Sequence, residues 1–99
     1  MKYFLTIKDD AITDARIAYT YYESQQRGLG EKFLKTLENI YAVVLKNPYV
    51  YQVRYQSTRF AMLKKFPFVV IYEVSKTEIV IYFIVHSSRD ENRWKVKLK

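Results

Sequence analysis

Residues 59–74, RFAMLKKFPFVVIYEV, combine three cations with a run of apolar and aromatic side chains. Arg59, Lys64 and Lys65 precede a segment, residues 68–74, whose composition is typical of a buried strand. This charge has two explanations. Lysines at a sheet edge protect that edge against aggregation, whereas an arginine fork binds a phosphate group through two hydrogen bonds. The segment is therefore a candidate surface for a polyanion.

Acid–base chemistry has few candidate residues in this chain, which contains one histidine, His86, and no cysteine. A pair of two histidines is excluded, so acid–base chemistry would have to use His86, a lysine or a tyrosine with a shifted pKa, or positioned arginines. A histidine that ends an apolar strand is, alternatively, a structural residue. Because cysteine is absent, disulfides and thiolate metal sites are excluded, and we expect no metal and no cofactor.

The net charge of +7 is uneven along the chain. Residues 1–53 hold seven Lys/Arg and six Asp/Glu, a net of +1, and residues 54–99 hold ten and four, a net of +6. A basic half attracts phosphate backbones or an acidic protein partner, and the alternative is solubility alone. We expect the C-terminal sheet to gather these cations into one concave electropositive surface, covered by paired helices.

Composition predicts one folded domain over residues 1–99, because 49% of the chain is hydrophobic and only two glycines and two prolines occur. The apolar run after Met1 is too short for a signal peptide. No stretch approaches the roughly 18 apolar residues of a membrane span. A soluble cytoplasmic protein is the expectation.

Two helices and a set of strands must position the candidate residues. Residues 2–7 predict a first strand, and the spacing of small residues and tyrosines over 11–26 predicts a helix. Gly28 suits a left-handed C-terminal cap for this first helix. Residues 31–46 predict a second helix with a clear apolar face, which Asn47-Pro48 ends.

The remainder of the chain predicts strands. Residues 49–54 and 59–66 are candidates on either side of a turn at 56–58, followed by 68–74 and 78–86. Residues 78–86 are the most apolar run and predict a central strand that is buried on both faces. Short connections favour an antiparallel meander. The predicted fold is α+β, a helical hairpin packed on a small antiparallel sheet with the order β-α-α-β-β-β.

This order, with several local stretches, resembles the RelE/ParE superfamily of bacterial toxins from type II toxin–antitoxin systems. The resemblance covers about residues 3–94. Its stretches are AYTYYESQQRGLGEKFLKTLE (18–38) for the helix pair, KNPYVY (46–51) for the helix exit, RFAMLKKFPFVVIYEV (59–74) for an arginine before a Phe-Pro-aromatic turn, and IVHSSRDENRW (84–94) for a His-x-x-Arg ending. Asp90-Glu91-Asn92 departs from the proline or asparagine that many relatives have after that arginine.

The resemblance implies a toxin with one of two actions. RelE-like members cut messenger RNA in the ribosomal A site, and ParE-like members inhibit DNA gyrase. The GLG break and the His-x-x-Arg ending are more similar to ParE-like members, so we expect a gyrase inhibitor. The alternatives are a RelE-like, ribosome-dependent mRNA endonuclease and a non-toxic basic module that binds nucleic acid. A toxin of this kind implies a small acidic antitoxin whose C-terminal segment folds on binding.

The nuclease alternative would need specific residues. In metal-independent cleavage the RNA 2′-OH attacks the adjacent phosphorus, which requires a base, cations and an acid. The catalytic candidates are then Arg59, Lys65, His86, Arg89 and Tyr72. Strand alternation over 59–66 places Arg59 and Lys65 on one face, although Arg59 can also pair with Glu73 or Glu78 across the sheet.

Binding to nucleic acid or to a protein target involves an overlapping set of basic residues. Tyr49 and Tyr51, beside Arg54, are candidates for stacking on bases, and Trp94 is expected to anchor the tail to the core. The predicted binding residues are Arg54, Arg59, Lys64, Lys65, Arg89 and Arg93.

Overall fold

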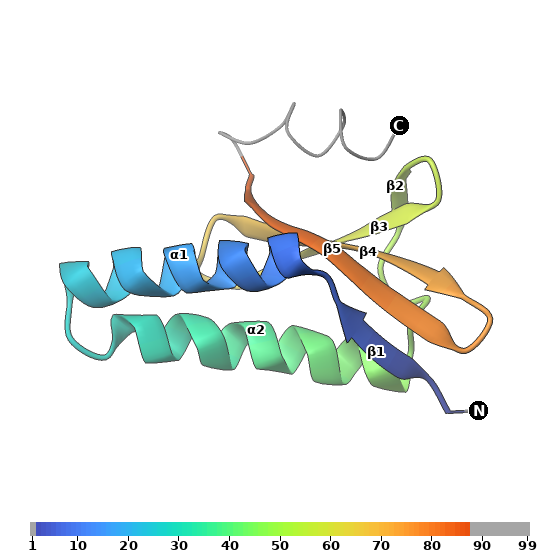
Figure 1. Cartoon of the computed structure of the whole chain (residues 1–99), viewed down its shortest axis with the longest axis horizontal. Helices are drawn as coiled ribbons and strands as arrows, with labels where there is room; N and C mark the ends of the chain where they lie inside the picture. The colour runs from blue at the N-terminus through green and yellow to red at the C-terminus, as the bar shows by residue number, and fades with distance from the viewer. Residues whose placement is uncertain (1, 88–99) are drawn as a thin grey trace.

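The structure is a computed structural model that describes residues 2–87 (Figure 1). A strand comes first, two helices follow, and four strands complete the described chain. The elements are β1 (Phe4–Ile7), α1 (Asp9–Gln25), α2 (Leu29–Lys46), β2 (Val53–Tyr55), β3 (Thr58–Met62), β4 (Phe68–Ser75) and β5 (Glu78–His86). The candidate segment 59–66 contains β3, whereas the predicted strand 49–54 overlaps β2 only at Val53 and Arg54 and its first four residues are not in a strand. The sheet has one strand more than the order β-α-α-β-β-β.

The five strands form one mixed sheet with the order β1-β5-β4-β3-β2. The four strands after the helices pair antiparallel, which confirms the predicted meander. β1 adds a parallel pair along β5, and a long connection that contains both helices and strands β2, β3 and β4 joins the two. The predicted α+β fold is therefore present, with a parallel edge that local sequence patterns did not indicate.

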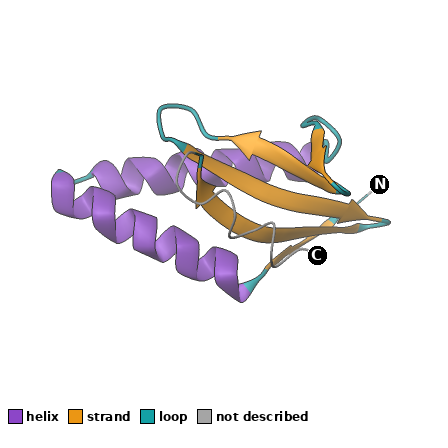
Figure 2. Ribbon diagram, turned by 90° about the horizontal axis from the view of Figure 1, so that it is seen from above, coloured by secondary structure: helices purple, strands orange, loops and turns teal. Residues whose placement is uncertain are grey.

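The helical hairpin packs on one face of the sheet (Figure 2). Side chains of both helices form one cluster with alternate residues of β4 and β5. The helices contribute Ala11, Ala18, Phe33, Leu37, Ile40 and Val44, and the two strands contribute Val70, Tyr72, Ile79, Ile81 and Ile84. Residues 78–86 form the buried central strand that their composition predicts, since β5 lies between β1 and β4.

The opposite face of the sheet, here called the outer face, is also apolar. Val69, Ile71, Phe83 and Val85 form a second buried cluster there, with Tyr55, Phe60 and Tyr82 packed against it. β4 and β5 therefore carry apolar residues on both faces, as expected for the two central strands of a small sheet.

A loop ends β3 earlier than the sequence predicts. The predicted strand 59–66 stops at Met62, and residues 63–67 turn back to β4. The main-chain N–H of Leu63 donates to the carbonyl of Phe68 at 3.0 Å and closes this hairpin. Within residues 2–87, no helix is long and apolar enough to span a membrane.

Candidate functional site

The predicted cations lie at two ends of the sheet. Arg54 in β2 and Arg59 near the start of β3 lie at one end, and Lys64 and Lys65 lie in the loop after β3 at the other. At about 3.3 Å per residue, β3 extends about 10 Å from Arg59 to Met62 before that loop begins. The described cations therefore do not form the single concave electropositive surface that the sequence predicted.

Lys65 does not share the face of Arg59 in the way that strand alternation implied. The backbone of Lys65 has a φ of 69°, in the left-handed region, and β3 has already ended at Met62. Alternation of side chains holds only along an extended strand. Strand alternation therefore does not place Lys65 on the face of Arg59, and the predicted pairing of the two loses its basis.

Arg59 is held by two tyrosines at the end of α2. In the ladder Arg59 lies opposite Tyr72, on the helix-facing side of the sheet. Its Nη1 donates a hydrogen bond to the main-chain carbonyl of Tyr51 at 2.6 Å. The guanidinium carbon lies 5.0 Å from the ring centroid of Tyr49, a cation–π contact. Tyr49 and Tyr51, predicted as stacking candidates beside Arg54, instead position Arg59.

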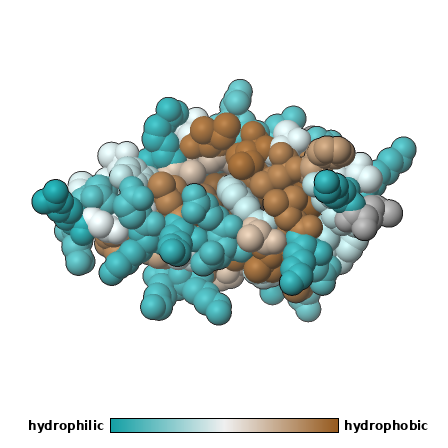
Figure 3. Space-filling model, turned by 90° about the horizontal axis from the view of Figure 1, so that it is seen from below, coloured by the Kyte–Doolittle hydropathy of each residue, from teal (hydrophilic) through white to brown (hydrophobic). Residues whose placement is uncertain are grey.

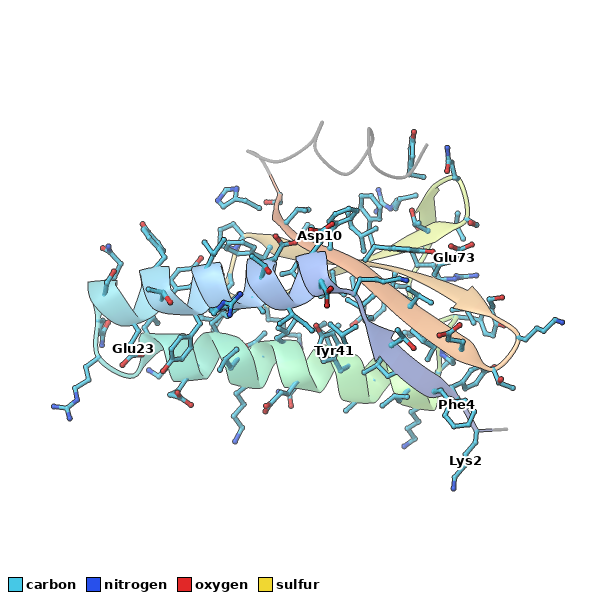
Figure 4. The ribbon with its side chains drawn as sticks, in the orientation of Figure 1. Lys2, Phe4, Asp10, Glu23, Tyr41 and Glu73 are labelled. Carbon is cyan, nitrogen blue, oxygen red and sulfur yellow. The ribbon has the colours of Figure 1, made fainter. Side chains whose placement is uncertain are left out.

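The carboxylates predicted as partners of Arg59 accept hydrogen bonds from hydroxyl groups. Glu73 accepts from Tyr82 at 2.8 Å and also from Ser57. Glu78 accepts from Thr6 at 2.7 Å. The view with side chains labels Glu73 on the part of the sheet that carries β3 and β4 (Figure 4). The contacts that hold Arg59 are thus a carbonyl oxygen and a ring.

Tyr72 is withdrawn from solvent. Its side chain is fully buried, and its hydroxyl donates to the carbonyl of Pro48 at 2.8 Å. Burial raises the pKa of Tyr72 to about 12, although the nearby Arg59 opposes that change. The hydrogen bond from this buried hydroxyl joins β4 to the segment after α2. Because the whole side chain is buried, the hydroxyl cannot act as an acid on RNA and the ring cannot stack on a base.

His86 lies at the Lys64–Lys65 end of the sheet. Its ring packs edge-on against Phe68, with the ring centroids 5.4 Å apart. Next to it, the main-chain N–H of Ser87 donates to the carbonyl of Pro67 at 2.8 Å. The structure therefore brings His86 close to the loop after β3, at the opposite end of β3 from Arg59.

The remaining predicted site residues, Arg89, Arg93 and Trp94, lie outside the described residues. Residues 88–99 hold five Lys/Arg and two Asp/Glu, so they contribute +3 of the +6 in the C-terminal half.

Two carboxylates that the sequence patterns did not indicate organise the scaffold. Asp14 on α1 is buried, and it accepts a hydrogen bond from the main-chain N–H of Ile84 in β5 at 3.0 Å. Glu23 lies beside the turn between the helices (Figure 4) and accepts from the N–H groups of Gly28 and Gly30, at 2.9 Å each. The sequence did contain one indication that Asp14 is buried: this aspartate occurs among the small residues whose spacing over 11–26 predicts the first helix.

Known proteins match both the sequence and this fold. The family model for the ParE toxin of type II toxin–antitoxin systems, parDE, matches residues 5–91. No curated protein matches the chain. A chain of the chromosomal ParDE system from P. aeruginosa is 23% identical, with a TM-score of 0.65, and the match covers 86% of this chain and 96% of that one.

Two structures from E. coli have the same fold. A chain of the intact RelBE toxin–antitoxin complex is 18% identical, with a TM-score of 0.68, over 88% of this chain and 99% of that one. The isolated RelE toxin is 18% identical, with a TM-score of 0.66, over 97% and 96%. The family match spans most of the chain and agrees with the observed fold, and by that match the chain belongs to the ParE toxin family of type II toxin–antitoxin systems.

Proposed function

We propose that this toxin inhibits DNA gyrase and does not cleave RNA. The observation that carries the proposal is the apolar character of both faces of the sheet. The inner face is packed under the helices, and the outer face carries Val69, Ile71, Phe83 and Val85. A surface for RNA cleavage would present several cations on one face to stabilise the phosphorane.

The candidate acid, base and cations of a nuclease are far apart in the described chain. Arg59 lies at one end of β3, while Lys65 and His86 lie at the other. Tyr72 is buried and bonded to a main-chain carbonyl. Cleavage needs these groups within hydrogen-bond reach of one phosphodiester, so their separation favours a toxin that acts by binding.

A protein target fits the exposed surface of the molecule. Phe4, Ile17, Tyr49 and Met62 each expose more than half of their side-chain surface. Seen from below, apolar side chains gather on the part of the surface that carries β1 and the C-terminal half of α2 (Figure 3). Exposed apolar surface of this kind is typical of sites that bind proteins.

The cognate antitoxin is the second proposed partner. The ParDE and RelBE structures similar to this chain come from toxin–antitoxin systems. A net charge of +7 favours a small acidic protein, whose association is accelerated by electrostatic steering.

The test is a supercoiling assay with the purified chain. Gyrase is incubated with relaxed plasmid and ATP, with and without the toxin, and RNA 5′ ends are sequenced from cells in which the toxin is induced. We expect supercoiling to stop while messenger RNA remains intact. Relaxation by a type I topoisomerase is the matched control and should be unchanged.

Two outcomes would contradict gyrase inhibition. New cuts within codons that disappear in Arg59→Ala and Arg89→Ala variants, with normal supercoiling, would establish the RelE-like activity. Healthy growth with normal supercoiling and intact RNA would leave the non-toxic binding module, for which weak, salt-sensitive binding to any nucleic acid is expected.

A further inference from the structure

The Arg59 guanidinium is fixed in place before any ligand arrives. The short hydrogen bond to the Tyr51 carbonyl sets the orientation of its plane, and the Tyr49 ring lies against it. A guanidinium has five N–H donors in a rigid fork, and the described bond uses one nitrogen. An arginine held in this way loses little side-chain entropy on binding an anion.

The positive charge of this guanidinium is not cancelled by the groups that hold it. A carbonyl oxygen and an aromatic ring are both neutral, and Glu73 and Glu78, the carboxylates of β4 and β5, accept bonds from hydroxyl groups. The side chain is half-buried, where water screens a charge less than it does at a fully exposed position. An anion that reaches Arg59 therefore meets an arginine ready for charge-assisted hydrogen bonds.

The rim around Arg59 is apolar. Val53 lies opposite Arg59 in the β2–β3 ladder. Tyr49, Val50 and Val53 expose 55%, 49% and 47% of their surface. This combination of one fixed cation with exposed aromatic and branched side chains fits a peptide segment that carries one carboxylate among apolar residues.

A nucleic-acid backbone fits this rim less well. Each strand carries a phosphate about every 3.4 Å, so its binding sites align several cations along the strand. Arg54 follows Val53 in β2 at this end of the sheet, but Lys64 and Lys65 lie beyond the far end of β3, so the described strands do not align a longer row of cations with Arg59.

We propose that Arg59, framed by Tyr49, Tyr51 and Val53, is a docking site for an aspartate or glutamate side chain on an apolar segment of a partner protein. The site goes beyond gyrase inhibition, because it specifies the chemistry of a ligand whichever partner supplies it.

The proposal is tested with two synthetic peptides on the unmodified full chain. Acetyl-Leu-Glu-Leu-amide and its uncharged twin, acetyl-Leu-Gln-Leu-amide, are titrated while the Arg Nε–H signals and the Tyr ring signals are followed by NMR. We expect the Arg59 and Tyr49 signals to move with the glutamate peptide, at a concentration about tenfold lower than with the glutamine peptide. This comparison uses one folded protein, so stability differences between variants do not affect it.

Variants then identify the groups that bind the carboxylate. Arg59→Met should abolish the preference for the glutamate peptide, and Arg59→Lys should reduce it because an ammonium lacks the fork. Tyr49→Phe keeps the ring and should bind as the parent does, whereas Tyr49→Ala should weaken binding several-fold. Circular dichroism spectra confirm that each variant is folded.

Three results would overturn the site. Equal shifts with the two peptides would mean that the carboxylate is not recognised. NMR shifts confined to Lys64, Lys65 and His86 would show that the anion binds at the other end of the sheet. Saturation by inorganic phosphate at a lower concentration than by the glutamate peptide would identify a nucleic-acid backbone as the ligand. If the toxin fails to inhibit gyrase, only the proposed function fails, because the peptide titration does not depend on gyrase.

Discussion

Two buried polar side chains, Asp14 and Tyr72, join the helical hairpin to the sheet through main-chain atoms. Asp14 accepts from Ile84 in β5, and Tyr72 donates to Pro48 after α2. Burial, together with the Asp14 carboxylate on α1, raises the pKa of Tyr41 on α2 above its usual value, so this phenol stays neutral. Each bond satisfies a main-chain group at a point where regular pairing ends or shifts.

The Asp14 carboxylate is expected to stabilise the fold through the Ile84 bond. Asp14→Ala leaves a buried N–H without its acceptor and should lower the free energy of unfolding by about 2–3 kcal/mol. Asp14→Asn keeps a carbonyl acceptor of the same shape and should lose about 1 kcal/mol. Urea unfolding followed by circular dichroism measures both changes. Equal losses in the two variants would show that the negative charge, rather than the hydrogen bond, is what matters.

At the scale of elements, the turn between α1 and α2 determines how closely the helices approach. Gly28 adopts the predicted left-handed backbone, with a φ of +87°, but it is the N-cap of α2, because the C-cap of α1 is Gln26 in an extended conformation. The Glu23 carboxylate then binds two N–H groups of the first turn of α2, which a helix otherwise leaves without partners. At Gly30, a Cβ atom would lie 2.8 Å from Cδ2 of Tyr19 and 2.9 Å from a carboxylate oxygen of Glu23.

Gly30→Ala is therefore expected to destabilise the hairpin, although alanine favours helices. The added methyl group must displace the Tyr19 ring or the capping carboxylate, and the net loss in unfolding free energy should be about 1–2 kcal/mol. The matched control is Gly28→Asn, because asparagine tolerates a left-handed backbone and the space around Gly28 is open. The control should change stability by less than about 1 kcal/mol. Thermal unfolding measures both, and a stabilised Gly30→Ala variant would contradict the close approach of the helices.

At the scale of the whole molecule, the positive charge within residues 2–87 is divided between two ends of the sheet rather than collected in one place. Arg54 and Arg59 lie at one end of the sheet, Lys64 and Lys65 at the other, and residues 88–99 contribute a further +3. A divided charge still produces a field around the protein, which accelerates encounter with an acidic partner. It does not assemble the cluster of cations that phosphoryl chemistry requires.

The association rate with an acidic antitoxin should therefore depend on salt and on total charge. Between about 50 and 500 mM NaCl the rate constant should fall about tenfold, because the Debye length shortens below the separation of surface charges. Lys64→Gln/Lys65→Gln should slow association more than Lys32→Gln/Lys35→Gln, which removes the same charge from the less basic half. Stopped-flow mixing measures these rates. An association rate constant that does not change with salt would show that electrostatic steering does not accelerate the encounter.

The local elements followed from the sequence alone. The helices at 9–25 and 29–46, the left-handed Gly28 and the doubly buried β5 arise from periodicity and from residues that end or cap a helix within a few positions. These interactions join residues that are close together in the sequence, so the local pattern of residue types determines them. The family resemblance also came from such stretches, and the match over residues 5–91 agrees with it.

Only the tertiary structure decided where the functional groups lie. The end of β3 at Met62 is determined by its closure onto β4, and this separates Lys65 from Arg59. The parallel pairing of β1 with β5 joins residues more than 70 positions apart, and Arg59 meets Tyr49 because the segment after α2 passes beside β3. Such contacts depend on how whole elements pack, which the alternation of residues within a single strand cannot specify.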